Sequence, residues 1–166
     1  MKLRLTEDLA TTRLQTPIGE LRLAANQDGL LAVLFPVDPY ELPALQGAAR
    51  ARAHLSDVCT ALEEYFAGQR TTFEGLKLAP SGTEFQLQVW NALSRIPFGQ
   101  TATYAGMAKR IGRPSAVRAV GHANGQNPLP IIVPCHRVVG SNGALTGFAG
   151  GIPTKKWLLE FEGAGV

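Results

Sequence analysis

Residues 103–125 read TYAGMAKRIGRPSAVRAVGHANG, two short stretches of helical character on either side of a break at Gly112-Arg113-Pro114. The first stretch predicts a helix of about 103–111, with Thr103 as a candidate N-cap. The second predicts a helix of about 114–124, with Pro114 in its first turn and its end near Gly125. Two short helices joined by a glycine-containing turn form a helix-turn-helix pattern. The pattern alone is a weak signal of DNA binding, because most helix pairs of this kind bind nothing.

Helices are also predicted on both sides of this pair. Residues 84–95 carry an apolar stripe at helical spacing, and Thr83 precedes them as a candidate N-cap. A last helix is expected over about 153–162. Between the pair and this last helix, residues 128–139 predict a loop followed by a strand, and residues 140–153 predict an irregular glycine-rich loop. The second half of the chain is therefore expected to be mostly helical.

The first half of the chain has a different pattern. Apolar runs and alternation predict short strands at 13–16, 20–24, 30–35 and 71–74, with a helix over about 47–67. The tetrapeptide Ala-Pro-Ser-Gly at 79–82 is typical of a boundary. We therefore expect an α/β domain over residues 1–79, built from a small sheet and a helix, and a helical domain over residues 80–166.

The composition is that of a folded protein, with 45% hydrophobic and 17% charged residues. No run of eighteen apolar residues is present, so we expect no membrane-spanning segment and no membrane partner. The N-terminus lacks the apolar core and the small-residue cleavage site of a signal peptide, which favours a cytoplasmic location.

The charges are divided unevenly along the chain. Residues 1–78 carry a net charge of −2 and residues 79–166 a net charge of +5, because the second half holds only three acidic residues. A shortage of carboxylates favours binding to a polyanion, since each carboxylate near a phosphate would repel it. The charge alone is equally consistent with a moderately basic domain that binds no nucleic acid.

The two cysteines, Cys59 and Cys135, lie 76 residues apart. No C-x-x-C or H-x-x-x-H spacing accompanies them, so neither a disulfide nor a structural zinc site is expected. Cys59 falls within the helix predicted at 47–67, where the expected role is that of a small hydrophobic side chain. We expect no metal ion and no cofactor.

Cys135 lies in a different context, between Pro134 and His136 and two residues before Arg137. A cysteine is nucleophilic only as the thiolate, so it needs a neighbour that removes its proton or stabilises its charge. His136 is one candidate, acting through a water because adjacent side chains of an extended strand point to opposite faces. Glu162, on the last helix, is a candidate to orient His136, and Arg137 is expected to bond inside the fold. From these residues alone, a buried cysteine beside a surface histidine is the slightly favoured interpretation.

Five motifs follow one another over about 65 residues between Phe98 and Gly163. They are RAVG at 118–121, NP at 127–128, IVPCHRVV at 132–139, GFAGG at 147–151 and WLLEFEG at 157–163. This series closely resembles the O6-alkylguanine-DNA alkyltransferases, also called methylated-DNA–protein-cysteine methyltransferases. The first half of the chain resembles the smaller α/β domain of that family only in layout.

The resemblance implies a fold and a function. The implied fold is an N-terminal α/β subdomain of ribonuclease-H-like layout, followed by a mostly α-helical, winged helix-turn-helix-like DNA-binding subdomain. The implied function is DNA repair by a monomer without a cofactor, which binds the minor groove of double-stranded DNA and flips out O6-alkylguanine, because the alkyl carbon lies inside the base stack. The alkyl group then passes irreversibly to the protein's own cysteine in a single turnover. O4-alkylthymine is a further candidate substrate.

The resemblance also assigns roles to residues. Cys135 accepts the alkyl group, and His136, backed by Glu162, removes the thiol proton through a water. Asn127 braces the turn that brings the nucleophile against the second helix of the pair, and Tyr104 rotates the target phosphate and protonates the leaving guanine. The residues assigned to DNA are Arg118, which fills the gap left by the flipped nucleotide, and Tyr104, Ser115, Ala116, Ala119 and Ser141. Those assigned to the substrate pocket are Pro130, Val138, Phe148, Ala149 and Gly150.

Two pocket positions depart from the family's pattern, and two other functions stay open. Phe148 stands where many members have tyrosine and Ala149 where some have serine, so the preference among bulky alkyl groups is expected to differ. A protein that binds alkylated DNA without repairing it would lack the acceptor cysteine, which is present here. A cysteine hydrolase using Cys135 and His136 would turn over many times, whereas an alkyl thioether does not hydrolyse.

Overall fold

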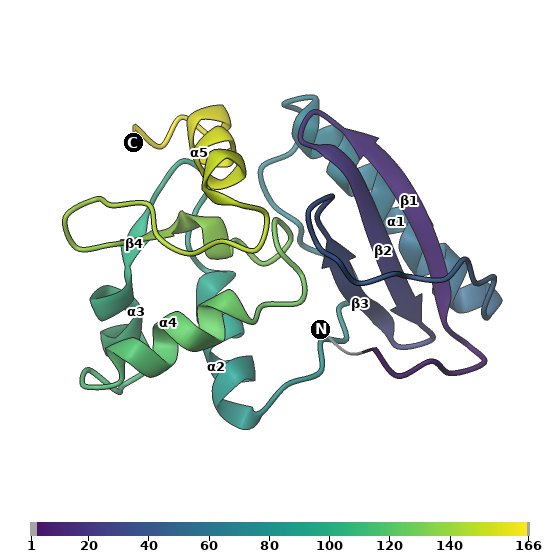
Figure 1. The fold of residues 1–166 in the computed structure, drawn as a ribbon, viewed down its shortest axis with the longest axis horizontal. Coiled ribbons are helices and arrows are strands. Elements are labelled where there is room, and N and C mark those ends of the chain that lie inside the picture. The colour runs from purple at the N-terminus through teal and green to yellow at the C-terminus, as the bar shows by residue number, and fades with distance from the viewer. Residues whose placement is uncertain (1–2, 166) are drawn as a thin grey trace. The chain divides into compact units, whose positions relative to one another are not determined.

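The computed structural model describes residues 3–165. They divide into two compact units, one ending at Ser81 and the other starting at Gly82, each with its own secondary structure (Figure 1). Within the described range, none of the helices combines the length and apolarity that a membrane crossing requires. The same range holds no group of three or more His, Cys, Asp or Glu side chains placed to bind a metal ion.

The first unit is a three-stranded antiparallel sheet with one helix. The strands β1 (Ala10–Thr16), β2 (Gly19–Asn26) and β3 (Gly29–Leu34) pair in sequence order, and the helix is α1 (Ala49–Phe66). Figure 1 shows α1 lying across one face of the sheet, where it contacts all three strands. Leu21 and Leu23 alternate along β2 with more exposed residues and are fully buried. The small sheet plus helix predicted for this half is confirmed.

The strand predicted at 71–74 is wrong. Phe73 packs instead against Tyr65 near the end of α1, with the two ring centroids 5.5 Å apart. The chain meets the sheet a few residues later, where the amide of Leu30 donates to the carbonyl of Lys77 at 2.9 Å. Aromatic packing on the helix therefore outweighs the β propensity of this segment.

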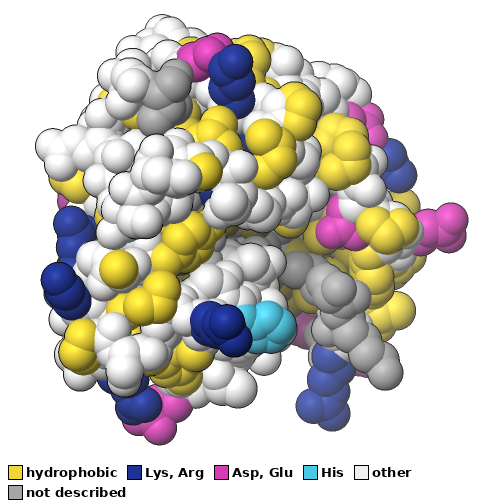
Figure 2. All heavy atoms as spheres, turned by 60° about the vertical axis from the view of Figure 1, so that its left-hand side comes forward, with side chains coloured by type: hydrophobic (Ala, Val, Ile, Leu, Met, Phe, Trp, Pro, Cys, Tyr) yellow, Lys and Arg dark blue, Asp and Glu magenta, His cyan; other side chains and the backbone are white. Residues whose placement is uncertain are grey.

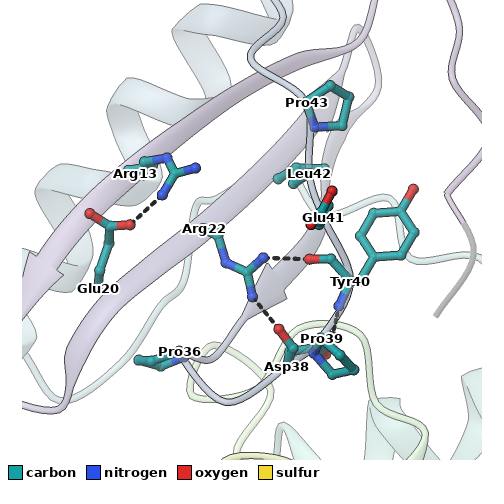
Figure 3. Close-up of a pocket in the computed structure, with 10 residues that line it drawn as sticks. All are labelled: Arg13, Glu20, Arg22, Pro36, Asp38, Pro39, Tyr40, Glu41, Leu42 and Pro43. Carbon is teal, nitrogen blue, oxygen red and sulfur yellow. Dashed lines mark hydrogen bonds and ion pairs between the residues drawn. The ribbon is translucent and has the colours of Figure 1, made fainter.

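A hollow of about 640 Å³ lies beside the sheet of the first unit and is lined in part by the proline-rich loop 36–43. Figure 3 shows Arg22 extending from β2 to this loop. Its guanidinium donates hydrogen bonds to the backbone carbonyls of Phe35, Asp38 and Tyr40. None of the residues assigned a role from the sequence lines this hollow, so we assign Arg22 to holding the loop in place.

The second unit is mostly helical, and the predicted fold class is confirmed. Its elements are α2 (Glu84–Leu93), β4 (Ala102–Thr103), α3 (Tyr104–Arg110), α4 (Val117–Gly125), a 3-10 turn (Cys135–Arg137), β5 (Val138–Val139) and α5 (Ile152–Phe161). Both predicted N-caps are present: the Thr83 hydroxyl accepts from the amide of Gln86 within a capping box, and the Thr103 hydroxyl accepts from the amide of Gly106. Helices α2, α3 and α4 pack on one another.

The second helix of the pair begins later than predicted. Pro114 lies in a turn rather than in the first turn of the helix, and the amide of Ala116 donates to the carbonyl of Arg113 at 2.9 Å. This hydrogen bond closes the turn locally, so the helix starts at Val117. The prediction of two short helices around a glycine-containing break is otherwise confirmed.

The strand predicted within 128–139 is also largely wrong. The strand in this segment is limited to Val138–Val139, which pairs in parallel with β4, while Pro130 and Val133 form an isolated bridge and Cys135–Arg137 form the 3-10 turn. The reason lies just upstream, because Pro134 has no N–H to offer a sheet and the carbonyl of Val133 is occupied by the side chain of Asn127. The nucleophile candidate therefore sits on a turn.

Candidate active site

The segment before Cys135 is a tight turn braced by Asn127. The side-chain amide of Asn127 donates to the carbonyl of Val133 at 2.8 Å, and its Oδ1 accepts from the amide of Leu129 at 3.0 Å. The turn holds Ile131 at a φ of 74°, a conformation that is rare for a β-branched residue and costs about 1–3 kcal/mol. The hydrogen bonds of Asn127 thus hold a strained turn in one position beside the cysteine.

Cys135 is the first residue of the 3-10 turn and is 5% exposed. Burial raises the pKa of its thiol above the ordinary value. The side-chain amide of Asn127, the charge of Lys155, and the backbone amides of Cys135 and His136 act in the opposite direction. Ionisation of this thiol therefore depends on specific neighbours rather than on water.

Lys155, on α5, is a buried cation that the sequence analysis missed. Its side chain is fully buried, and Nζ donates to the carbonyls of Val138 at 2.7 Å and Thr146 at 2.9 Å. Burial lowers the pKa of Lys155, and the attraction of Cys135 opposes that effect. Its position in the sequence was the one signal of burial. Lys155 precedes the buried residues 158 and 159 by three and four positions, so it lies on the same face of the helix.

His136 and Arg137 share one carboxylate, that of Glu162 at the end of α5. His136 Nε2 lies 2.9 Å from Glu162 Oε2, and Arg137 donates from Nε to Oε1 at 2.8 Å and from Nη2 to Oε2 at 2.9 Å. A carboxylate only accepts, so Nε2 of His136 carries a proton, and Nδ1 is the basic nitrogen of the neutral ring. Burial lowers the pKa of His136 despite the opposing effect of Glu162, which favours that neutral ring. Within the described residues, Nδ1 is buried without a hydrogen-bond partner.

Arg137 belongs to the internal framework of the site. Its Nη1 donates to the carbonyl of Ile96 at 2.7 Å, and its guanidinium lies 5.8 Å from the centroid of the Phe98 ring. The expectation that Arg137 bonds inside the fold is confirmed. The alternative of a surface histidine is wrong, because His136 is fully buried.

An apolar hollow of about 540 Å³ forms between α3, α4 and the loop after β5. Its lining residues are Tyr104, Val117, Gly121, Gly125, Thr146, Gly147 and Phe148. The hydroxyls of Tyr104 and Thr146, two of these lining residues, lie 3.2 Å apart. Of the predicted pocket residues, Phe148 lines the hollow. Pro130, Val138 and Gly150 are buried elsewhere in the unit and Ala149 is exposed.

Four of the predicted DNA-binding residues lie at the N-terminal end of α4, while Tyr104 begins α3. Arg118 and Ala119 are exposed on the helix, Ser115 is exposed in the preceding turn, and Ala116 is the N-cap residue. Ser141 is exposed in the loop after β5. Figure 2 shows Lys and Arg side chains standing apart from one another among uncharged and apolar ones. The surface in this view is therefore not one continuous basic patch.

Two family models match the chain. The model described as the DNA binding domain of 6-O-methylguanine DNA methyltransferase matches residues 84–164. The model described as the ribonuclease-like domain of 6-O-methylguanine DNA methyltransferase matches residues 9–80. Together the two models account for nearly all of the chain, in the order in which its two units occur.

Individual proteins are similar over nearly their whole length. The methylated-DNA–protein-cysteine methyltransferase of Methanosarcina acetivorans is 47% identical over 150 residues, which cover 90% of this chain and 96% of that protein. The constitutive methylated-DNA–protein-cysteine methyltransferase of Bacillus subtilis is 43% identical over 155 residues, which cover 91% of this chain and 93% of that protein. The crystal structure of Mycobacterium tuberculosis OGT in complex with DNA is 42% identical, covers 93% of each chain and has a TM-score of 0.83.

Proposed function

The chain belongs to the 6-O-methylguanine DNA methyltransferase family, and on that premise we propose that it repairs double-stranded DNA by transferring the alkyl group of O6-alkylguanine to Cys135. The observation that carries the proposal is the buried thiol of Cys135, followed directly in the sequence by a buried histidine, His136, whose Nε2 bonds to Glu162. The protein acts as a monomer, with residues 80–166 as the DNA-binding and acceptor domain and residues 1–79 as the α/β domain. The division of the structure after Ser81 supports this boundary.

The proposed chemical step uses the side chains around Cys135. A water passes the proton of the Cys135 thiol to Nδ1 of His136, and the charge of Lys155 stabilises the thiolate. The sulfur attacks the alkyl carbon, a carbon–sulfur bond forms, and the bond from that carbon to O6 breaks with its electron pair left on guanine. Tyr104 supplies a proton to the leaving base. Because the thioether is not hydrolysed, each molecule reacts once.

The recognition step uses α4 and the hollow beside it. Ala116 and Ala119 are small enough for α4 to approach a minor groove that is only about 6 Å wide, with Ser115 and Ser141 exposed for backbone contacts. Extruding the nucleotide costs a few kcal/mol, which insertion of Arg118 into the stack offsets. The extruded base enters the hollow lined by Phe148. Pro130, Val138, Ala149 and Gly150 do not line this hollow, and their assignment to the pocket stays a prediction from the family resemblance.

Incubation with an oligonucleotide containing O6-methylguanine is expected to add one methyl group per protein molecule. Intact mass spectrometry measures the number of groups, and peptide mapping is expected to place the adduct on Cys135. Burial and the nearby Glu63 both raise the pKa of Cys59, whereas at Cys135 the side chains of Asn127 and Lys155 oppose the effect of burial. An oligonucleotide with unmodified guanine serves as the control. Binding without an adduct would indicate a protein that only recognises damage, and continuing release of product would indicate a hydrolase.

Replacing Arg118 with alanine is expected to slow repair of duplex DNA several-fold while leaving the reaction with free O6-benzylguanine unchanged. Arg118 is exposed on α4 and is assigned to the vacated base stack, a role that the free base does not require. The matched control is Lys156→Ala, which removes one positive charge from an exposed position on α5. Equal losses with both substrates in Arg118→Ala would place this residue in the chemistry or the fold.

A further inference from the structure

Asn124, on α4, holds a buried acceptor without a partner. The residue is 4% exposed, and its Oδ1 makes no hydrogen bond to any residue that the structure describes. The amide nitrogen Nδ2 lies 3.5 Å from the carbonyl oxygen of Cys135. A carbonyl oxygen accepts only, so the nitrogen must face Cys135, and the unsatisfied atom is the side-chain oxygen. A buried acceptor in this state calls for a functional explanation.

The position of Asn124 suggests what its oxygen meets. Gly121, one turn earlier on α4, and Gly125, the next residue, both line the apolar hollow, and the backbone of Cys135 lies on the other side of the amide. The hydroxyls of Tyr104 and Thr146 at the hollow are bonded to each other. Asn124 is not itself a lining residue, but it lies on α4 between two positions that line the hollow and contacts the backbone of Cys135. It therefore supplies an uncommitted acceptor close to both the proposed base pocket and the proposed alkyl acceptor.

We propose that Oδ1 of Asn124 accepts a hydrogen bond from the 2-amino group of the extruded O6-alkylguanine and so contributes to the choice of base. The inference rests on the proposed function. Alkylation of O6 removes the proton from N1, so in DNA the nitrogen atoms of the ring and O6 itself can only accept. The 2-amino group is then the sole N–H donor of the base. O4-alkylthymine in DNA has no N–H donor, which ranks it as the poorer substrate.

A different role for Asn124 would be to hold the water that links the Cys135 thiol to Nδ1 of His136, which is the other unpartnered acceptor beside the nucleophile. The two roles differ in their consequences. A residue that holds the water affects every alkyl donor equally, whereas a residue that reads the base affects only donors with a 2-amino group. The geometry favours base reading, because Asn124 lies on the helix that lines the hollow.

The test compares two double-stranded oligonucleotides, one with O6-methylguanine and one with O6-methylhypoxanthine, which lacks the 2-amino group. The rate of methylation of Cys135 is measured for each by quenched mass spectrometry. The preference for O6-methylguanine is expected to be about tenfold larger in the wild type than in Asn124→Leu, which keeps the shape and removes the acceptor. Asn124→Asp keeps an oxygen acceptor and is expected to retain the preference.

Several controls isolate the contact. Both rates are measured on the same preparation, so a misfolded fraction cancels from the ratio, and the intrinsic reactivities of the two bases cancel between variants. Gln126→Leu, at the C-cap of the same helix, is the matched control. The Gln126 side chain bonds to Gln86, so this variant is expected to keep the wild-type preference.

An unchanged preference in Asn124→Leu would overturn the inference. Equal slowing with both oligonucleotides would assign Asn124 to the relay water or to the fold, and it would overturn the inference as well. Loss of the preference in Asn124→Asp would show that the oxygen acceptor is not the reason for it. Absence of methylation of the wild type by either oligonucleotide would contradict the proposed function itself, so the two failures are distinguishable.

Discussion

Replacing Glu162 with alanine is expected to lower the free energy of unfolding by roughly 3–5 kcal/mol, the typical effect of removing one partner from a buried ion pair. Glu162 accepts two hydrogen bonds from Arg137 and one from His136, and none of the three residues is more than 5% exposed. Without the carboxylate, the described bonds of the Arg137 guanidinium reduce to the one with Ile96. Urea denaturation of the wild type and the variant measures the difference.

Glu160→Ala is the matched control for this substitution. Glu160 is an acidic residue on the same helix, but its side chain is 56% exposed and 3.9 Å from the similarly exposed Lys156. Its loss is expected to change stability by less than about 0.5 kcal/mol. Similar losses in Glu160→Ala and Glu162→Ala would show that the buried network does not stabilise the unit more than a surface charge does.

The chemical role of Glu162 is separated from its structural role by Glu162→Gln. This variant keeps the shape and an oxygen acceptor but loses the charge that fixes the protonated Nε2 of His136. We expect it to alkylate Cys135 roughly 100- to 10,000-fold more slowly, the usual contribution of a positioned base, under conditions where it remains folded. A wild-type rate in Glu162→Gln would exclude this carboxylate from the proton transfer.

Replacing Lys155 with methionine is expected to slow alkylation of Cys135 at neutral pH by roughly a hundredfold, the usual effect of losing one preorganised electrostatic group. The positive charge of Lys155 lowers the pKa of the Cys135 thiol against the larger effect of burial. Methionine has a similar length and no charge, so the thiolate loses a stabilising neighbour. The rate of reaction with O6-benzylguanine measures the effect without the contribution of DNA binding.

The pH dependence gives this prediction a second readout. The thiolate is the reactive form and burial raises the pKa of the thiol, so the wild-type rate is expected to rise with pH from neutral upward. In Lys155→Met the rise is expected at higher pH, because the thiolate is less favoured. Lys156→Met, at an exposed neighbouring position, serves as the control. A lower rate with an unshifted profile would mean that Lys155 only holds the carbonyls of Val138 and Thr146 in place.

The regular elements were largely predictable because short-range signals determine them. Thr83 and Thr103 cap α2 and α3 as expected, and the alternation along β2 places Leu21 and Leu23 in the core. The irregular elements were not predictable in the same way. Pattern alone suggested a strand at Cys135, where a side chain and a proline upstream produce a turn.

The candidate site was likewise predictable only in part. The resemblance to a family, not periodicity, assigned roles to Cys135, His136 and Glu162, and the structure adds the tautomer of the histidine and the depth of burial. Lys155 was not predicted, because its partners are backbone carbonyls from a loop and a short strand. A pattern of side chains in the sequence does not reveal such partners. Asn124 was not predicted for a similar reason, because the one hydrogen bond that its side chain makes among the described residues is to a backbone carbonyl.

The pKa of the buried ammonium of Lys155 depends on the charge state of Cys135. The one influence that raises the pKa of Lys155 is Cys135, which acts when the sulfur is negative. In the proposed reaction the alkylated sulfur carries no charge, so the influence of Cys135 is lost and no longer opposes the effect of burial on Lys155. Alkylation of Cys135 is therefore expected to lower the pKa of a side chain 20 residues further along the chain. The alkylated protein is then expected to differ from the unreacted one in the proton affinity of a buried ammonium as well as in mass.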